Sequence, residues 1–175
     1  MRKLICVSVV ITLCFALFAC ATSQKHPVFK NLAITNKTNK DITIESDSTW
    51  SISLDKDLSA ILNAFDVSSL SDEEKEREKH NLARLSLNIQ ANNYDDIMLI
   101  EEDSLSVADY NADQVTFFYM SGNTQLMNIS VSFYDDDYCY TFIFVCPANA
   151  VGDHIDSFYD MLLGIEVMQS RSIKT

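Results

Sequence analysis

Apolar and polar residues alternate along much of the second half of the chain, a pattern typical of strands that bury one face. The segments Val115–Met120 and Gln125–Tyr134 are therefore predicted strands. Tyr138–Cys146 carries apolar residues at both odd and even positions, which predicts an interior strand with a covering layer on each side. We expect Phe142 to face one helical layer and Ile143 to face the other.

The first half mixes short strands with one helical pattern. Residues 31–36 and 41–46 alternate and predict a hairpin, and Trp50–Leu54 predicts a third strand. Apolar residues recur at helical spacing through Leu58–Phe65, which predicts a helix. Asp96–Glu101 predicts a further strand.

Two longer helices are predicted from their termini. Ser71 to Glu74 forms a capping box, and the charged residues that follow are expected to form a solvated helix face. The core contacts of this helix are expected to be Leu82, Leu85 and Ile89. The last helix is predicted over Gly152–Leu163 and is followed by a short strand, Ile165–Met168.

These elements predict an α+β fold: a mainly antiparallel sheet with helices on both faces, that is, an α/β/α sandwich. The order resembles that of PsbP-like and DcrB-like domains over residues 45–168. The resemblance lies in Trp50 before an early strand, the meander over 115–146 that ends in YCYTFIFVCP, and the helix that runs into GIEV. It implies the sandwich fold and, since such domains share no single activity, it implies no chemistry.

The N-terminus has the layout of a secretory signal peptide. Arg2 and Lys3 precede the uncharged run Leu4–Ala19, which is shorter than the roughly 20 residues that a membrane-spanning helix needs. Its end, Leu17-Phe18-Ala19-Cys20, resembles the lipobox of bacterial lipoproteins. The resemblance implies a diacylglyceryl group on the Cys20 thiol, cleavage before Cys20, and often a further acyl chain such as palmitate on the new amine.

The predicted organisation is a signal peptide over 1–19, a tether over 20–30, and one α+β domain over 31–175. Ala21 follows the cysteine where an aspartate would indicate inner-membrane retention, so the outer membrane is favoured in a Gram-negative cell. Two alternatives stay open at this point. Ala19-Cys20-Ala21 also fits ordinary cleavage with release after Ala21, and the apolar run could remain as an uncleaved anchor.

Composition and charge narrow the function classes. Hydrophobic residues make up 47% and charged residues 22% of the chain, as in globular proteins. The formal net charge is −12, and it becomes −14 without residues 1–19, which hold Arg2, Lys3 and no acid. A body this acidic repels phosphate backbones, so nucleic acid is excluded as a partner.

The sequence contains few candidates for catalytic or metal-binding residues. Its histidines, His26, His80 and His154, do not have the spacing of zinc ligands. Acidic clusters occur at 95–96, 101–103 and 135–137, none fits the calcium loop of an EF-hand, and we expect them to be solvated. The sequence predicts no catalytic, cofactor-binding or metal-binding residues, no cofactor, and no enzymatic activity.

The two cysteines of the domain, Cys139 and Cys146, lie on one predicted strand. Seven residues of strand place them about 23 Å apart and on opposite faces, whereas a disulfide needs Cα atoms within about 7 Å. We therefore expect two buried thiols that are not joined to each other.

The leading hypothesis is a non-catalytic, lipid-anchored protein of the bacterial envelope. It would be held at the membrane by Cys20 and would bind an unidentified envelope protein or support envelope maintenance. Two alternatives are a carrier of a small apolar ligand and a secreted soluble protein with an unrecognised activity.

The lipobox generates a first prediction. Metabolic labelling with a fatty-acid analogue should mark the wild-type protein and leave Cys20→Ala unmarked, because the lipid attaches to the thiol that this change removes. Gel fluorescence of the purified protein measures the label. Equal labelling of both forms would show that Cys20 is not the lipid site.

Overall fold

The computed structural model describes residues 28–34, 42–55, 58–94 and 96–168. A seven-stranded antiparallel sheet forms its centre, in the order β3-β4-β5-β9-β8-β7-β6. The strands are β3 (Ile42–Ser46), β4 (Thr49–Asp55), β5 (Leu58–Asp66), β6 (Ile97–Val107), β7 (Tyr110–Ser121), β8 (Thr124–Tyr134) and β9 (Tyr138–Pro147). The strands predicted over 115–120, 125–134 and 138–146 are confirmed as β7, β8 and β9.

Both ends of the described chain form a second, smaller sheet. It contains β1 (Val28–Phe29), β2 (Leu32–Ile34) and β10 (Ile165–Val167), in the order β1-β2-β10. Phe29 of β1 packs on Trp50 of β4, with ring centroids 4.8 Å apart. Because Phe29 is buried in the main core, the folded part extends back at least to Val28, inside the segment predicted as a tether.

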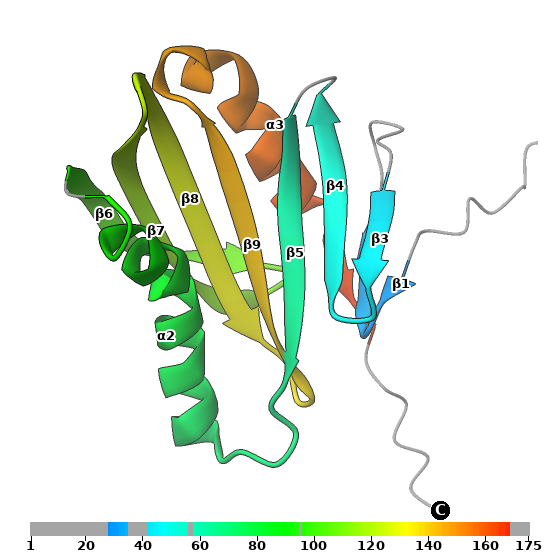
Figure 1. The fold of residues 1–175 in the computed structure, drawn as a ribbon. Helices are drawn as coiled ribbons and strands as arrows, with labels where there is room; N and C mark the ends of the chain where they lie inside the picture. Colours follow the sequence, from blue (N-terminus) through cyan, green and yellow to red (C-terminus); the bar gives the residue numbers. More distant parts are fainter. Residues whose placement is uncertain (1–27, 35–41, 56–57, 95, 169–175) are drawn as a thin grey trace, which may run out of the picture.

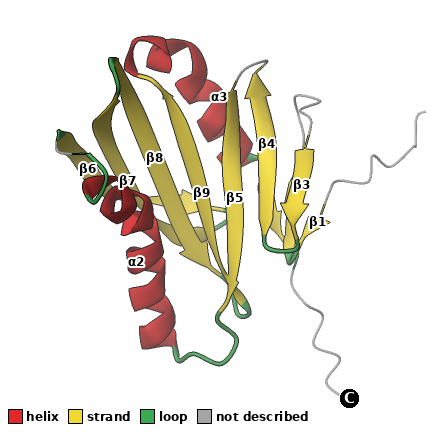
Figure 2. Ribbon diagram, in the orientation of Figure 1, coloured by secondary structure: helices red, strands yellow, loops and turns green. Residues whose placement is uncertain are grey.

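Helices cover both faces of the large sheet, as predicted (Figures 1 and 2). α2 (Asp72–Ala91) lies across β7, β8 and β9 on one face, and α3 (Val151–Leu163) lies against β4 and β9 on the other. A short 3₁₀ turn, η1 (Ala148–Ala150), leads into α3. We call the two sides of the sheet the α2 face and the α3 face. The result is the α+β sandwich that the pattern predicts.

The main core lies on the α3 face and is rich in aromatic rings. Tyr140, Phe142 and Phe144 alternate along β9 and are fully buried. Phe144 stacks on Phe158 of α3, with centroids 5.0 Å apart. The aromatic row of β9 therefore fills the core.

The other face of β9 is only partly covered. Ile143 pairs with Ile61 of β5 on one side and with Ser130 of β8 on the other, and it is half-buried. Phe142 and Ile143 do face opposite layers, as predicted. α2 lies across β7 to β9 and does not extend over β3, β4 and β5, so Ile143 is less enclosed than expected.

α2 begins as predicted but buries a different stripe. The Ser71 hydroxyl accepts from the Glu74 backbone N–H, and the Glu74 carboxylate accepts from the Ser71 backbone N–H. The predicted core contacts are wrong, since Leu85 and Ile89 are 40% and 49% exposed and Leu82 is half-buried. The buried residues are Lys75, Lys79, Ala83, Ser86 and Leu87. The charged run therefore supplies part of the buried face.

Two further predictions are wrong. Leu58–Phe65 belongs to strand β5, in which Ala60, Leu62 and Ala64 are buried. The small alanines carry the true two-residue period, while the larger Ile61 and Phe65 point to the α2 face and are partly exposed. The hairpin over 31–46 does not form either, because β2 and β3 belong to different sheets. Residues 35–41 lie outside the described ranges.

The unequal cover of β9 gives the second prediction. Phe142→Ala should lower the free energy of unfolding by about 3–5 kcal/mol, because it leaves a cavity in a closed core. Ile143→Ala should lower it by less than about 2 kcal/mol, because half-burial reduces both the transfer and the cavity costs. Urea unfolding midpoints of the two variants measure the difference. Equal losses would mean that the two faces of β9 are covered equally.

Candidate functional site

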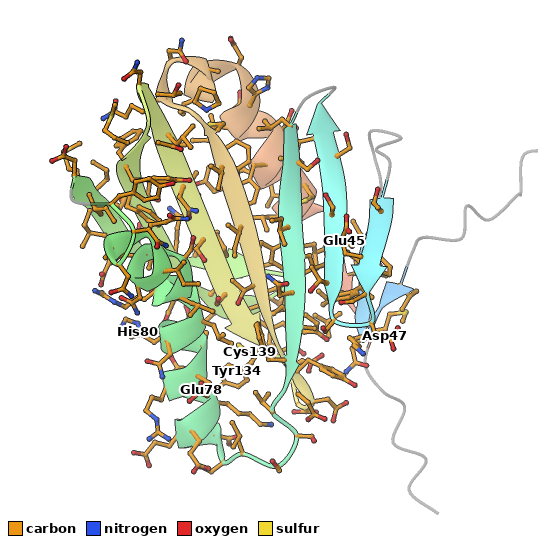
Figure 3. The ribbon with its side chains drawn as sticks, in the orientation of Figure 1. Glu45, Asp47, Glu78, His80, Tyr134 and Cys139 are labelled. Carbon is orange, nitrogen blue, oxygen red and sulfur yellow. The ribbon has the colours of Figure 1, made fainter. Side chains whose placement is uncertain are left out.

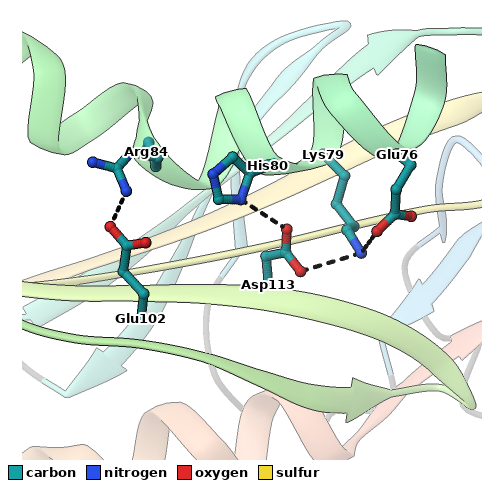
Figure 4. A network of polar contacts seen from close by, with 6 residues as sticks. All are labelled: Glu76, Lys79, His80, Arg84, Glu102 and Asp113. Carbon is teal, nitrogen blue, oxygen red and sulfur yellow. Dashed lines mark hydrogen bonds and ion pairs between the residues drawn. The ribbon is translucent and has the colours of Figure 1, made fainter. Parts of the chain in front are cut away.

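A polar network joins α2 to β7 (Figure 4). The Lys79 side chain is fully buried, and its Nζ lies 2.6 Å from Glu76 Oε1 and 3.2 Å from Asp113 Oδ1. Burial alone would lower the pKa of Lys79, but the hydrogen bonds to the two carboxylates outweigh it and raise that pKa. An amine kept charged and held by two acids is a poor nucleophile or base, so the network serves the fold.

A hollow of about 240 Å³ opens beside this network. His80 Nδ1 lies 3.4 Å from Asp113 Oδ2, and Ser104 is the cross-strand partner of Asp113. The hollow is lined by His80, Glu102, Asp103, Ser104, Asp113, Gln114 and Val115. A Ser-His-Asp site needs its hydroxyl bonded to the imidazole. In the described part of the chain no hydrogen bond joins Ser104 to His80, so the arrangement for nucleophilic attack is incomplete.

The acidic β8–β9 turn forms a second hollow of about 170 Å³. Asp135 is 5% exposed, so the expectation of a solvated cluster is wrong for this residue, while Asp136 is exposed as expected. Its Oδ1 accepts from the backbone N–H groups of Asp137 and Tyr138, at 2.8 and 2.7 Å. Its Oδ2 accepts from Asn31 Nδ2 and from the Tyr140 hydroxyl, both at 3.0 Å. With both oxygens occupied, Asp135 is a structural carboxylate.

The two cysteines of the domain are free and buried, as predicted. They lie on opposite faces of β9, where Cys139 pairs with Tyr134 and Cys146 with Met127. Burial raises the pKa of the Cys139 thiol to about 12 and also raises that of Cys146. The thiolate is the reactive form, so neither group is suited to nucleophilic chemistry. Figure 3 shows Cys139 beneath α2, near Glu78 and Tyr134.

The remaining residues of interest are scattered. His80 is half exposed on α2, while His154 lies at the start of α3. Cys20, His26 and Asp95 lie outside the described residues. Within the described ranges, no three His, Cys, Asp or Glu side chains are placed to hold a metal ion. In the same ranges, no helix combines the length and apolar character needed to cross a bilayer.

Strand β6 forms one edge of the large sheet. Among the described strands, only β7 pairs with it. Met98, Leu99 and Ile100 are 52%, 46% and 47% exposed. The acids Glu101, Glu102 and Asp103 follow directly and are exposed as well. We call residues 98–103 the β6 edge.

The opposite edge of the sheet differs. β3 has five residues against eleven in β6, and its hairpin with β4 carries the acids Glu45 and Asp47, labelled in Figure 3. Long apolar edges invite pairing with another chain, and proteins commonly blunt them. The β6 edge is therefore the candidate interaction site. From the sequence we predicted a strand here but assigned it no function. The apolar run IMLI followed by the acids EED is the sequence feature that could have indicated one.

Comparison with solved structures supports the fold. The chain is similar to cyanobacterial PsbP (CyanoP) from Synechocystis sp. PCC 6803, with a TM-score of 0.56 and 7% identity over 84% of this chain and 95% of that one. No family of known sequences matches the chain, and no curated protein matches it in sequence.

Two weaker likenesses were found. One is to LpqN, involved in cell envelope biogenesis of Mycobacterium tuberculosis, with a TM-score of 0.49 and 7% identity over 82% of each chain. The other is to a protein of unknown function from Pseudomonas aeruginosa, with a TM-score of 0.47 and 9% identity over 71% of this chain and 81% of that one. At TM-scores below 0.5 these two add nothing to the assignment. The chain has a PsbP-like fold, which by itself assigns no activity.

The buried network generates the third prediction. Asp113→Asn should lower the free energy of unfolding by about 3 kcal/mol, because it leaves the Lys79 charge buried with Glu76 as its remaining acid. Arg84→Gln is the control: the Arg84–Glu102 pair is about one third exposed, so its loss should cost under about 1 kcal/mol. Urea unfolding compares the two. Equal costs would mean that Asp113 does not hold Lys79 in place.

Proposed function

We propose that the chain is a non-catalytic, lipid-anchored protein of the bacterial envelope that binds another protein. The proposed location in the envelope rests on the signal sequence and on the lipobox that ends at Cys20. Two or more acyl chains on one cysteine and its amine anchor a protein stably, where one chain binds reversibly. The observation that carries the binding role is the β6 edge, which pairs with β7 alone among the described strands and exposes three consecutive apolar side chains.

The polar hollows favour this role over chemistry. The hollow at His80 lacks the bonded hydroxyl of a triad, and the one at Asp135 is lined by a carboxylate whose oxygens are occupied. The aromatic row beside the central strand is packed against α3, so it does not supply the apolar cavity that a ligand carrier needs. Binding through a surface is the role that these observations support best.

The fourth prediction tests this role in the native bacterium with the full, lipidated chain. A photo-crosslinking amino acid in place of Met98 should give one discrete protein adduct in the membrane fraction, because Met98 is exposed on the β6 edge. Cys20→Ala should release the chain from that fraction and weaken the adduct, because partner and chain are then no longer held at one membrane. Immunoblotting after illumination measures both.

A matched position separates the outcomes. Asp47 is exposed at the opposite edge, so the same probe there should give no adduct. An adduct at Asp47 alone would support the binding role but would place the binding site at the opposite edge of the sheet. The absence of adducts at both positions, in cells that retain the protein at the membrane, would contradict the proposed function.

A further inference from the structure

We infer that β6 binds an extended segment of its partner as an added strand, and that this segment is apolar at one end and basic at the other. The inference rests on the proposed function and names the partner's chemistry at the same site. It follows from three properties of β6: its place in the sheet, its apolar half and its acidic half.

The place of β6 leaves its outer backbone available. β6 is the last strand in the order β3-β4-β5-β9-β8-β7-β6, and its eleven residues pair with β7 alone among the described strands. In an antiparallel edge strand, alternate residues turn their N–H and C=O groups away from the neighbour. A row of such groups is a template for another strand.

The apolar half offers contacts on both sides of an added strand. Leu99 pairs with Phe117 and so lies on the α2 face, while Met98 pairs with Phe118 and lies on the α3 face. Ile100 is the extra residue of a β-bulge between Leu99 and Glu101. An incoming strand with apolar residues on each face would therefore cover Met98 and Leu99 at cross-strand distance.

The acidic half sets the charge of the incoming segment. Arg84 pairs with Glu102, while Glu101 and Asp103 have no ion-pair partner in the described part of the chain. No lysine or arginine occurs between Arg84 and Arg171, a stretch that contains fourteen aspartates and glutamates. Opposite charges across neighbouring strands stabilise pairing and like charges oppose it. Lysine or arginine opposite residues 101–103 is thus favoured.

The same acids act against a second copy of this chain. A self-paired edge would bring two acidic stretches and two strongly negative bodies together. A bulge and charges are also devices by which proteins protect an edge from indiscriminate pairing. Here they leave three apolar side chains open, so they select a basic partner instead of closing the edge.

The test uses the full chain purified in detergent and a fluorescein-labelled peptide of ten residues. One half of the peptide alternates valine with threonine, and the other alternates lysine with threonine. Fluorescence anisotropy should show saturable binding, and hydrogen exchange should slow at amides within residues 97–103. A peptide with glutamate in place of lysine, and one with proline in the middle of its valine half, should each bind at least about tenfold more weakly.

Variants of the protein locate the binding. Ile100→Pro should weaken binding at least about tenfold, because proline on an edge strand blocks pairing with an added strand. Ile100 suits this change because it is the extra residue of the bulge, outside the register with β7. Glu45→Pro is the matched control, since Glu45 is the bulged residue of β3 at the other edge, and it should bind as wild type. The pair of changes Glu101→Lys and Asp103→Lys should also weaken binding about tenfold, while Asp153→Lys with Asp156→Lys on α3 should not.

Each contrary result overturns the inference. Equal binding of the proline-containing peptide would mean that charge alone attracts the probe. Binding that survives Ile100→Pro and the β6 charge reversal would place the site elsewhere. A dimer in sedimentation velocity that Ile100→Pro dissolves would make the partner a second copy. If the Met98 adduct forms in cells while the peptide does not bind, the proposed function stands and strand addition by a basic segment is wrong.

Discussion

The aromatic side chains on the α3 face must be shielded from solvent, and most of the architecture follows from that requirement. Phe133, Phe142 and Phe144 lie on adjacent central strands, with no exposure to water. One helix of thirteen residues cannot cover a sheet of seven strands, so the small sheet closes the remainder. Asn31 fastens this cover: its side chain donates to Asp135, and its carbonyl accepts from the Met168 backbone N–H. The two ends of the domain are thereby held together over one core.

The α2 face is built on different chemistry. Its apolar cluster is small, with Ala83 and Leu87 of α2 over aromatic residues of β7. The rest of the contact is polar: Asn128 Nδ2 donates to the Ser86 hydroxyl at 2.9 Å, and Lys79 joins Asp113. Packing on the α3 face consists of apolar contacts that exclude water and have no preferred direction. α2, by contrast, depends on hydrogen bonds and ion pairs, which require a fixed geometry. This difference explains why a helix with so many charges docks on the sheet at all.

The sequence predicts elements whose signal is local. The two-sided apolar run of β9 and the capping box at Ser71 need no knowledge of distant residues, and both are confirmed. Strand β5 is misread because Ala60 and Ala64 bury a small area and leave a helical spacing among the larger residues. Burial of Lys79 depends on Asp113 of another strand, which no local pattern reveals. The run IMLI-EED is visible in the sequence, but an edge is a property of strand order, so the run is recognised as an exposed edge only once the sheet is assembled.

The start of β1 at Val28 would limit how a domain anchored through Cys20, as proposed, can stand on a bilayer. Eight Cα steps separate Cys20 from Val28, a reach of at most about 29 Å. β1 packs beside β4, near one margin of the large sheet, and β6 forms the other margin. Six strand spacings of about 4.8 Å separate the two margins. With the proposed anchor, the domain would be tethered on the side of β1, and the β6 edge would lie away from the lipid headgroups when the β1 side rests on them.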